Sequence, residues 1–205
     1  LDLDVCHEYG IKVYGTNESD ERLRTMEYIG YTVLCLLLKN GLSPFSSNVL
    51  LVGSHRFTNP VEKILKQNNY ETFKVTDYSS PVNAKKFKSI IVLEHEREIL
   101  IIGGNSAFIN KKEIDYNTLV IHICGKVFFN NARFKFVPKE PAAFGNMSFT
   151  TDYIDNLAVI DLHTAGLKVA EGMLSASSAR LKGEEYKLFM EKNYPALGFD
   201  DQKYW

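Results

Sequence analysis

Short apolar runs that alternate with amphipathic stretches are the feature of this sequence that most limits its possible folds. Residues 48–54 (NVLLVGS), 88–95 (KSIIVLEH) and 118–125 (TLVIHICG) are apolar along most of their length, which is typical of strands buried on both faces of a parallel sheet. We predict strands at residues 48–54, 71–78, 88–95, 99–104, 118–125 and 156–163. Strands in alternation with helices predict an α/β fold with a doubly wound, mostly parallel, Rossmann-like sheet.

Helices are predicted before and between these strands. Residues 18–41 should form a long N-terminal helix, which Ser19 or Asp20 can cap and Gly41 ends. The second half of this helix is apolar nearly all round, so we expect it to be buried against the sheet or a partner subunit. Further helices are expected at residues 60–69, with Pro60 in the first turn, 110–115 and 164–183.

The length of 205 residues suits one domain with appendages. We expect residues 1–183 to form this Rossmann-like domain with flanking linker helices. Residues 184–205 are rich in aromatic side chains, and we expect this tail to act as a packing arm, either within the subunit or across a dimer.

The composition limits the partners of the protein. The net charge is -1 and 45% of the residues are hydrophobic, so neither nucleic acid nor an anionic membrane is an expected partner. No apolar run approaches the roughly 20 residues needed to span a bilayer. Cys6, Cys35 and Cys124 form no CxxC pair, and three free thiols indicate a reducing compartment, so we expect a cytoplasmic protein.

Residues 49–67 (VLLVGSHRFTNPVEKILKQ) have the form of a nucleotide-binding turn between a strand and a helix. Such a turn normally carries three glycines, and here Gly53 supplies the first, while His55 and Thr58 stand at the second and third. A Cβ at position 55 would push a pyrophosphate outward, but the helix N-terminus behind it still attracts an anion. We assign to the cofactor site the residues Gly53, Ser54, His55, Arg56, Phe57 and Thr58.

Asp77 follows the second predicted strand. It lies 24 residues after Gly53 (77 minus 53), which is about where an acidic residue binds the ribose hydroxyls of NAD. An acid at this position disfavours the additional phosphate of NADP. The alternative is that Asp77 caps the turn into Ser79, Ser80 and Pro81.

Several stretches together resemble one enzyme family. They are LDLDVCHEYGIKVYGTN (1–17), the helix at 20–40, VLLVGSHRFTNPVEKIL (49–65) followed by VTD (75–77), VPKEPA (137–142) and AVIDLHTAGLKVAEGM (158–173). In order and spacing they resemble the D-isomer-specific 2-hydroxyacid dehydrogenases and, more broadly, the formate/glycerate dehydrogenase group. The resemblance runs along most of residues 1–183.

The resemblance implies NAD as cofactor and hydride transfer between its nicotinamide and a small 2-oxo or 2-hydroxy acid. His163 matches the catalytic histidine of the family, the general acid, and a histidine can exchange protons near neutral pH. The arginine that holds the substrate carboxylate in the family is missing, and Lys126 is the cation that could replace it. Cys124 and Gly125 are assigned to the cofactor site, and Glu140 matches a structural acidic position before a proline.

Two further stretches have alternative interpretations. Residues 120–130 (VIHICGKVFFN) are similar to a stretch of S-adenosylhomocysteine hydrolases, which leaves a hydrolase-like use of tightly bound NAD open. Residues 94–98 (EHERE) contain metal-ligand types, but we expect a solvated charged turn there. His122 and Cys124 lie two residues apart and should share one side of a strand, yet no third ligand accompanies them, so no metal site is predicted.

The family also has an N-terminal substrate domain, on the order of a hundred residues, that this sequence lacks. Either that domain was removed, or it is a separate chain, or the protein does without it. We expect a homodimer because the family pairs through this domain. Three functions stay open: an NAD-dependent oxidoreductase or its nucleotide-binding part, a non-catalytic nucleotide- or partner-binding module, and an enzyme of different chemistry on the same scaffold.

Overall fold

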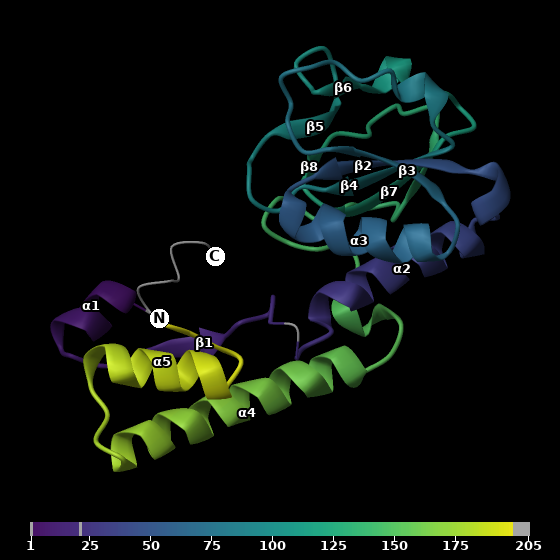
Figure 1. Ribbon diagram of the computed structural model, residues 1–205. Helices are drawn as coiled ribbons and strands as arrows, with labels where there is room; N and C mark the ends of the chain where they lie inside the picture. The colour runs from purple at the N-terminus through teal and green to yellow at the C-terminus, as the bar shows by residue number, and fades with distance from the viewer. Residues whose placement is uncertain (1, 21, 199–205) are drawn as a thin grey trace. The chain divides into compact units, whose positions relative to one another are not determined.

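The chain folds into two compact units, whose elements are labelled in Figure 1. The computed structural model describes residues 2–20 and 22–198. One unit, called here the sheet unit, is Met26–Ile154, and the other, the terminal unit, combines Leu1–Thr25 with Asp155–Trp205. This division does not fall after residue 183, where the sequence suggested a boundary, because the N-terminal residues pack with the C-terminal ones.

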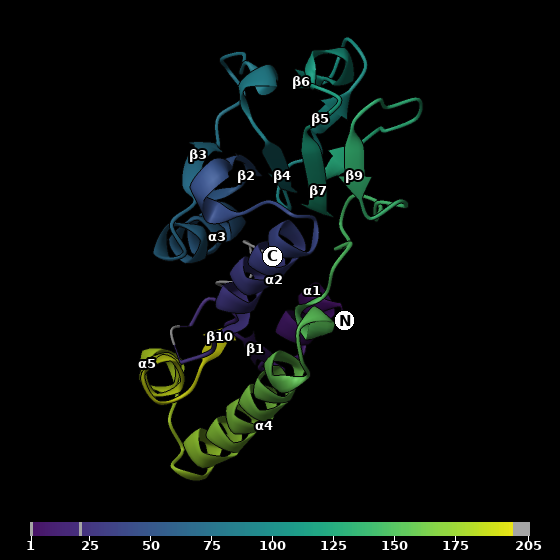
Figure 2. The same cartoon turned by 90° about the vertical axis from the view of Figure 1, so that its right-hand side faces the viewer.

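A five-stranded sheet forms the centre of the sheet unit, with the strand order β3-β2-β4-β7-β9 (Figure 2). The strands are β2 (Asn48–Gly53), β3 (Glu71–Val75), β4 (Ser89–Leu93), β7 (Leu119–Cys124) and β9 (Lys135–Val137). All neighbouring strands in it are parallel. The predicted α/β class with a mostly parallel, Rossmann-like sheet is therefore confirmed, and β9 is an edge strand that the sequence did not reveal.

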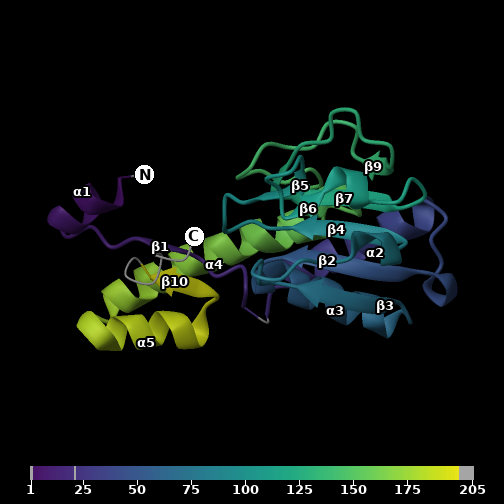
Figure 3. The same ribbon diagram turned by 90° about the horizontal axis from the view of Figure 1, so that it is seen from above.

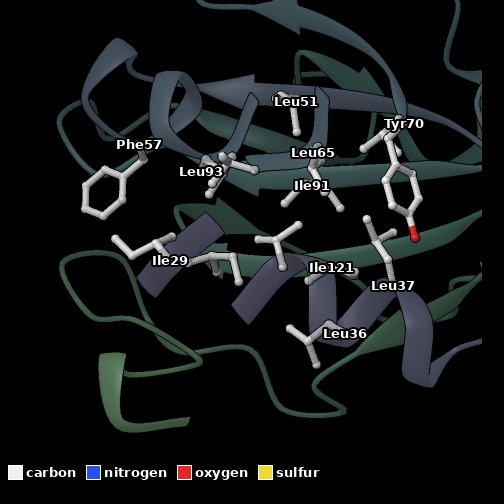
Figure 4. Close-up of a cluster of buried hydrophobic side chains, with 14 of the residues drawn as sticks. Ile29, Leu36, Leu37, Leu51, Phe57, Leu65, Tyr70, Ile91, Leu93 and Ile121 are labelled. Carbon is white, nitrogen blue, oxygen red and sulfur yellow. The ribbon is translucent and has the colours of Figure 1, made fainter. Parts of the chain in front are cut away.

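Two helices cover one face of this sheet. Figure 1 shows α2 (Thr25–Lys39) and α3 (His55–Gln67) on the same side of the strands. Figure 4 shows part of the core that they form with the sheet. This core includes Ile29, Val33, Leu36 and Leu37 of α2, Phe57, Val61 and Leu65 of α3, and Val49, Leu51, Ile91, Leu93 and Ile121 of the strands. Each aliphatic side chain fully buried here stabilises the fold by roughly 1.5–3 kcal/mol of transfer free energy.

The opposite face is covered without long helices. A second, three-stranded sheet of order β6-β5-β8 lies there, made of β5 (Leu100–Gly103), β6 (Ile109–Asn110) and β8 (Lys126–Val127). Short 3-10 turns, Ala84–Lys86 and Lys111–Glu113, accompany it. Its apolar side chains and Phe129 and Phe134 pack against the inward residues of β2, β4 and β7, such as Leu50, Ile90 and Val120. The doubly wound prediction assumed helices on both faces, whereas a small sheet and loops cover this one.

The direction of winding reverses around β2. The chain passes from β2 to β3 on one side and then crosses back to β4 on the other, and ligands of open α/β sheets bind at the carboxyl end of such a switch point. Gly53 lies there with φ +156, and a Cβ on it would come within 2.1 Å of the Leu93 carbonyl oxygen and 2.7 Å of the Glu94 nitrogen. The backbone after β4 therefore crosses the end of β2 at a distance that only glycine permits.

The terminal unit is built from both ends of the described chain. It contains α1 (Leu3–Glu8), β1 (Tyr14–Thr16), α4 (Leu157–Ser178), α5 (Gly183–Asn193) and β10 (Ala196–Gly198). Figure 3 shows α4 beside α5 and β1 beside β10, which pair as antiparallel strands. Its small core comprises Val169, Ala176, Tyr186, Met190 and Ala196. The predicted packing arm thus forms part of this core as far as residue 198, and residues 199–205 lie outside the described residues.

The strand predicted at residues 156–163 is wrong, because these residues form the beginning of α4, which runs from Leu157 to Ser178. A short apolar run cannot be assigned to a strand or a buried helix by periodicity alone. Neither glycine nor proline separates Leu157 from the predicted helix at 164–183, so one helix runs without a break from Leu157 to Ser178, five residues short of the predicted end.

Two helix starts also differ from the prediction. α2 begins at Thr25 instead of residue 18, since the Asp20 carboxylate bonds the backbone and the guanidinium of Arg22 and caps no helix. α3 begins at His55, five residues before the predicted start, so Pro60 lies inside the helix. Gly41, with φ +78, ends α2 as predicted.

Two further expectations from the sequence can be compared with the structure. Cys6, Cys35 and Cys124 are free thiols, as predicted. Among residues 2–20 and 22–198, no helix combines the length and the apolar character that a bilayer crossing requires.

We predict that Gly53→Ala destabilises the protein by about 3 kcal/mol, because the new methyl group would meet the backbone of Leu93 and Glu94. Urea denaturation followed by circular dichroism would measure this. Gly41→Ala is the matched control, since Gly41 also has a positive φ but nothing lies within 4 Å of its Cβ position. Its cost should be about 1 kcal/mol. Equal losses in the two variants would show that the close approach at Gly53 is unimportant.

Candidate functional site

The turn between β2 and α3 consists of a single residue. β2 ends at Gly53, α3 begins at His55, and Ser54 is the N-cap. The Ser54 side chain makes no capping hydrogen bond, and its buried hydroxyl has no partner among the described residues. Because no side chain caps α3, its first N–H groups and the positive end of the helix dipole are left to attract an anion.

The residues predicted for this turn divide into exposed and buried ones. His55 is exposed and Arg56 is half-buried, so these two side chains reach the surface at the helix N-terminus. Phe57 is buried, and its ring stacks on His95 with centroids 5.2 Å apart. Thr58 is buried and donates its hydroxyl proton to the Ser54 carbonyl at 2.9 Å. Thr58 therefore supports the turn from within, while the His55 side chain and part of the Arg56 side chain are exposed.

Asp77 lies just beyond β3, the neighbour of β2. Its carboxylate accepts hydrogen bonds from the Ser79 nitrogen at 3.1 Å and from the Ser79 hydroxyl at 2.6 Å. Both bonds lower the pKa of Asp77, and the bond from the Ser79 hydroxyl has the larger effect. The carboxylate is therefore ionised at neutral pH. The structure shows the turn-capping role, and the exposed carboxylate keeps further acceptor positions for a ribose.

The far side of the switch point carries the other predicted ligands. Cys124 ends β7 and is buried, which raises the pKa of its thiol to about 12. Gly125 has φ +123, and a Cβ on it would lie 3.1 Å from the Glu94 carbonyl oxygen. The Lys126 ammonium forms an ion pair with Glu98 at 2.7 Å. The cation predicted to hold a substrate carboxylate is thus engaged by a carboxylate of the protein.

His122 is a structural histidine in the sheet unit. Its Nδ1 lies 2.6 Å from the Ser148 hydroxyl and its Nε2 lies 2.9 Å from the Gly125 carbonyl oxygen. The carbonyl can only accept, so Nε2 carries the proton, and Ser148 donates to Nδ1 while accepting from the Ala142 nitrogen. Burial lowers the pKa of this imidazole, although the bond to Gly125 opposes the shift.

The expectation that His122 and Cys124 share one side of β7 is wrong. The register with β4 shifts between Val92, opposite His122, and Leu93, opposite Cys124. Ile123 is thus an additional residue of β7 that has no partner in β4, and it interrupts the alternation of side chains between the two faces of the sheet. As a result, the neighbouring residues Ile123 and Cys124 both lie in the core beneath α2 and α3. No group of three or more potential metal ligands gathers anywhere in the portion of the chain that the structure describes.

His163 does not lie at the end of a strand. It lies within α4 of the terminal unit, is exposed, and donates its Nδ1 proton to the Val159 carbonyl at 2.8 Å. Its Nε2 is left as the atom that could exchange a proton. His163 and Lys126 belong to different units, and their catalytic pairing stays a prediction.

Sequence reasoning missed Glu94, the first residue of the turn predicted to be solvated. Its side chain is fully buried and accepts hydrogen bonds from the Tyr78 hydroxyl, from the Arg97 guanidinium at 2.8 Å and from the backbone nitrogens of Glu96 and Arg97. The prediction failed for this residue because the structure compensates its charge locally. The available signal was its position directly after the apolar run at residues 90–93.

Comparisons with known proteins agree at the level of fold. The sequence matches no protein-family model and no curated protein. A Polaromonas protein assigned as an NAD-binding, D-isomer-specific 2-hydroxyacid dehydrogenase is similar in structure, with TM-score 0.53 and 8% identity over 86% of this chain and 72% of that chain. The NADPH-dependent glyoxylate/hydroxypyruvate reductase of Sinorhizobium meliloti gives TM-score 0.53 and 14% identity over 85% and 71%. The predicted resemblance is confirmed as a resemblance of fold.

A more distant match covers less of its counterpart. The bifunctional 5,10-methylenetetrahydrofolate dehydrogenase/cyclohydrolase of Thermoplasma acidophilum aligns with 69% of this chain and 50% of that chain, at TM-score 0.43 and 14% identity. This chain thus spans about half the length of that protein. At such similarity the match carries no functional argument.

We predict that His122 makes the stability of the protein depend on pH. Its pKa is lower in the folded state than the unfolded value of about 6.5, so the unfolded state binds more protons between the two values. Stability should therefore fall as the pH drops below about 6.5, by at most about 1.4 kcal/mol per pH unit, and this loss should stop below the folded pKa.

Urea unfolding of the wild type and of His122→Gln between pH 5 and pH 8 would measure this contribution. The variant should show a flatter pH profile, whereas His55→Gln, which changes an exposed histidine, should keep the wild-type profile. Parallel profiles for wild type and His122→Gln would contradict the assignment.

Proposed function

We propose that the sheet unit binds NAD at the carboxyl end of its central strands. The observation that carries the proposal is the uncapped N-terminus of α3, one residue after β2, with Asp77 at the end of the adjacent strand. A helix N-terminus supplies N–H donors to a phosphate, and an acid after the second strand supplies acceptors to a ribose. The N-terminus of α3 and Asp77 follow the carboxyl ends of the neighbouring strands β2 and β3.

The residues present fit the adenosine half of the cofactor. The pyrophosphate would meet the first turn of α3, with the exposed His55 and the Arg56 side chain beside it, and its position would lie further out than in a three-glycine turn. Asp77 would accept hydrogen bonds from the ribose hydroxyls. Bound NAD would supply a hydride acceptor or donor for an oxidoreductase.

The proposed reaction is the interconversion of a small 2-oxo acid and a 2-hydroxy acid. In this proposal His163 moves the proton and Lys126 holds the substrate carboxylate after leaving Glu98. Cys124 and Gly125 would border the nicotinamide. The support is the family resemblance of the sequence together with the similarity of fold. A homodimer in the cytoplasm belongs to the same proposal.

A non-catalytic nucleotide-binding module is the second candidate. It is favoured by the ion pair between Lys126 and Glu98 and by the buried, fully bonded His122, because neither group is free to act on a substrate as the structure stands. Because both ring nitrogens of His122 are bonded within the protein, this histidine also does not support the alternative of an enzyme with different chemistry on the same scaffold.

We predict that calorimetric titration with NADH detects micromolar binding to the wild type and that Asp77→Ala weakens it about tenfold or more. Hydrogen bonds to a charged group are worth about 1.5–3 kcal/mol, and about 1.4 kcal/mol is a factor of ten. Glu71→Ala removes an exposed acid from β3, the strand that precedes Asp77, and is the matched control. Absence of binding by NAD, NADH, NADP and adenosine nucleotides to the wild type would refute the proposal.

The catalytic proposal has a separate test. If the wild type oxidises NADH with pyruvate or glyoxylate, His163→Gln should lower kcat by about 100-fold or more, as expected for a general acid, and should leave NADH affinity unchanged. Thr164→Ala changes the next exposed residue of α4 and should keep its activity. NADH binding without turnover of any 2-oxo acid would favour the non-catalytic module.

A further inference from the structure

The buried Glu94 carboxylate joins the two segments that flank the end of β2. Glu94 follows β4, on one side of β2, while Tyr78 belongs to the segment after β3, on the other side. The Tyr78 hydroxyl donates to Glu94 Oε2. This contact therefore connects the two flanks of the switch point, at the edge of the sheet where the nucleotide is proposed to bind.

Arg97 forms a second connection between the segments that follow β3 and β4. Its guanidinium donates to Glu94 Oε2 from Nε at 3.2 Å and from Nη2 at 2.8 Å, and Nη2 also donates to the Thr76 carbonyl at 3.0 Å. The same guanidinium lies over the Tyr78 ring, 4.5 Å from its centroid. We call Tyr78, Glu94 and Arg97 the clamp.

The charge within the clamp is compensated. Burial would raise the pKa of Glu94, but the hydrogen bonds from Tyr78, Arg97 and the backbone outweigh it and keep the pKa below its usual value. Burial and the bond to Glu94 raise the pKa of Tyr78, so the hydroxyl keeps its proton and remains a donor. A buried carboxylate with this many donors is held in one orientation.

The clamp holds the two residues on either side of Asp77. Thr76 is bound through its carbonyl and Tyr78 through its hydroxyl, while the Tyr78 ring packs edge-on against Phe108 at 4.9 Å. The Asp77 carboxylate points to the exposed turn at Ser79, and the Tyr78 backbone and the charge of Arg97 add smaller contributions to its lowered pKa. The backbone on both sides of Asp77 is thus fixed from within, and its carboxylate is presented outside.

We propose that Tyr78, Glu94 and Arg97 are positioning residues that hold Asp77 where it can recognise the ribose hydroxyls of a bound adenosine nucleotide. This inference rests on the proposed nucleotide-binding function and extends it to groups that touch no ligand. Hydrogen-bonded recognition by one carboxylate depends on its placement, so loosening the clamp should weaken discrimination between ribose and deoxyribose.

The test compares the affinities of ADP and 2′-deoxy-ADP, measured by calorimetry. The wild type should bind ADP about tenfold more tightly, since the missing hydroxyl leaves the acceptor without a partner, and Asp77→Ala should bring the ratio close to one. Tyr78→Phe, which removes one hydroxyl, and Arg97→Lys, which removes the bond to Thr76, should each reduce the ratio at least about threefold. Tyr116→Phe, at an exposed tyrosine of the same unit, should leave it unchanged.

The outcomes separate this inference from the proposed function. A role in stability alone would lower the melting temperature and weaken both nucleotides equally, so an unchanged ratio in folded Tyr78→Phe overturns the inference while leaving nucleotide binding in place. If Tyr78→Phe does not fold, Arg97→Lys, which keeps a cation beside Glu94, decides in the same way. A wild type that binds neither nucleotide overturns both the function and the clamp's role in it.

Discussion

The backbone that leaves β4 runs between two glycines, and the candidate site depends on this passage. Gly53, at the end of β2, would carry its Cβ 2.1 Å from the Leu93 carbonyl oxygen, and Gly125, after β7, would carry its Cβ 3.1 Å from that of Glu94. β2 and β7 are the two neighbours of β4 in the sheet. The lack of side chains on both flanks lets the chain cross the carboxyl edge closely enough to bring Glu94 into the interior.

This arrangement gives Gly53 a role that a comparison with glycine motifs would not suggest. In the dinucleotide fold the first glycine makes the tight turn into the helix. Here the same residue also admits the backbone of the neighbouring strand. The packing of β2 against β4 requires a glycine at position 53 whatever the turn binds, although His55 and Thr58 stand at the second and third positions of the glycine pattern. The proposed nucleotide site therefore depends on the uncapped N-terminus of α3 and on Asp77 beyond the adjacent strand.

Much of the sheet unit could be predicted from the sequence because its three central strands, β2, β4 and β7, are buried on both faces and apolar along most of their length. β2, β4 and β7 were recognised in this way. The same rule failed at residues 156–163, where an apolar run begins a helix, because burial alone does not distinguish the two structures. β9 has only three residues, one of them exposed, and gave no periodic signal. For the proposed site, Gly53, Ser54 and Asp77 were predicted from spacing, and their contact with a cofactor stays a prediction. Glu94, Tyr78 and Arg97 were not predicted, since their partners lie up to 21 residues apart and only the strand order brings them together.

The pairing of β1 with β10 has a consequence for how the protein is made. Residues 14–16 pair with residues 196–198, so the terminal unit cannot close until nearly all of the described chain has left the ribosome. The sheet unit is continuous, from Met26 to Ile154, and can fold while the remainder is still being synthesised, as domains generally do. During that interval β1 lacks its partner strand, so this part of the terminal unit is exposed to proteases and chaperones for longer than the sheet unit.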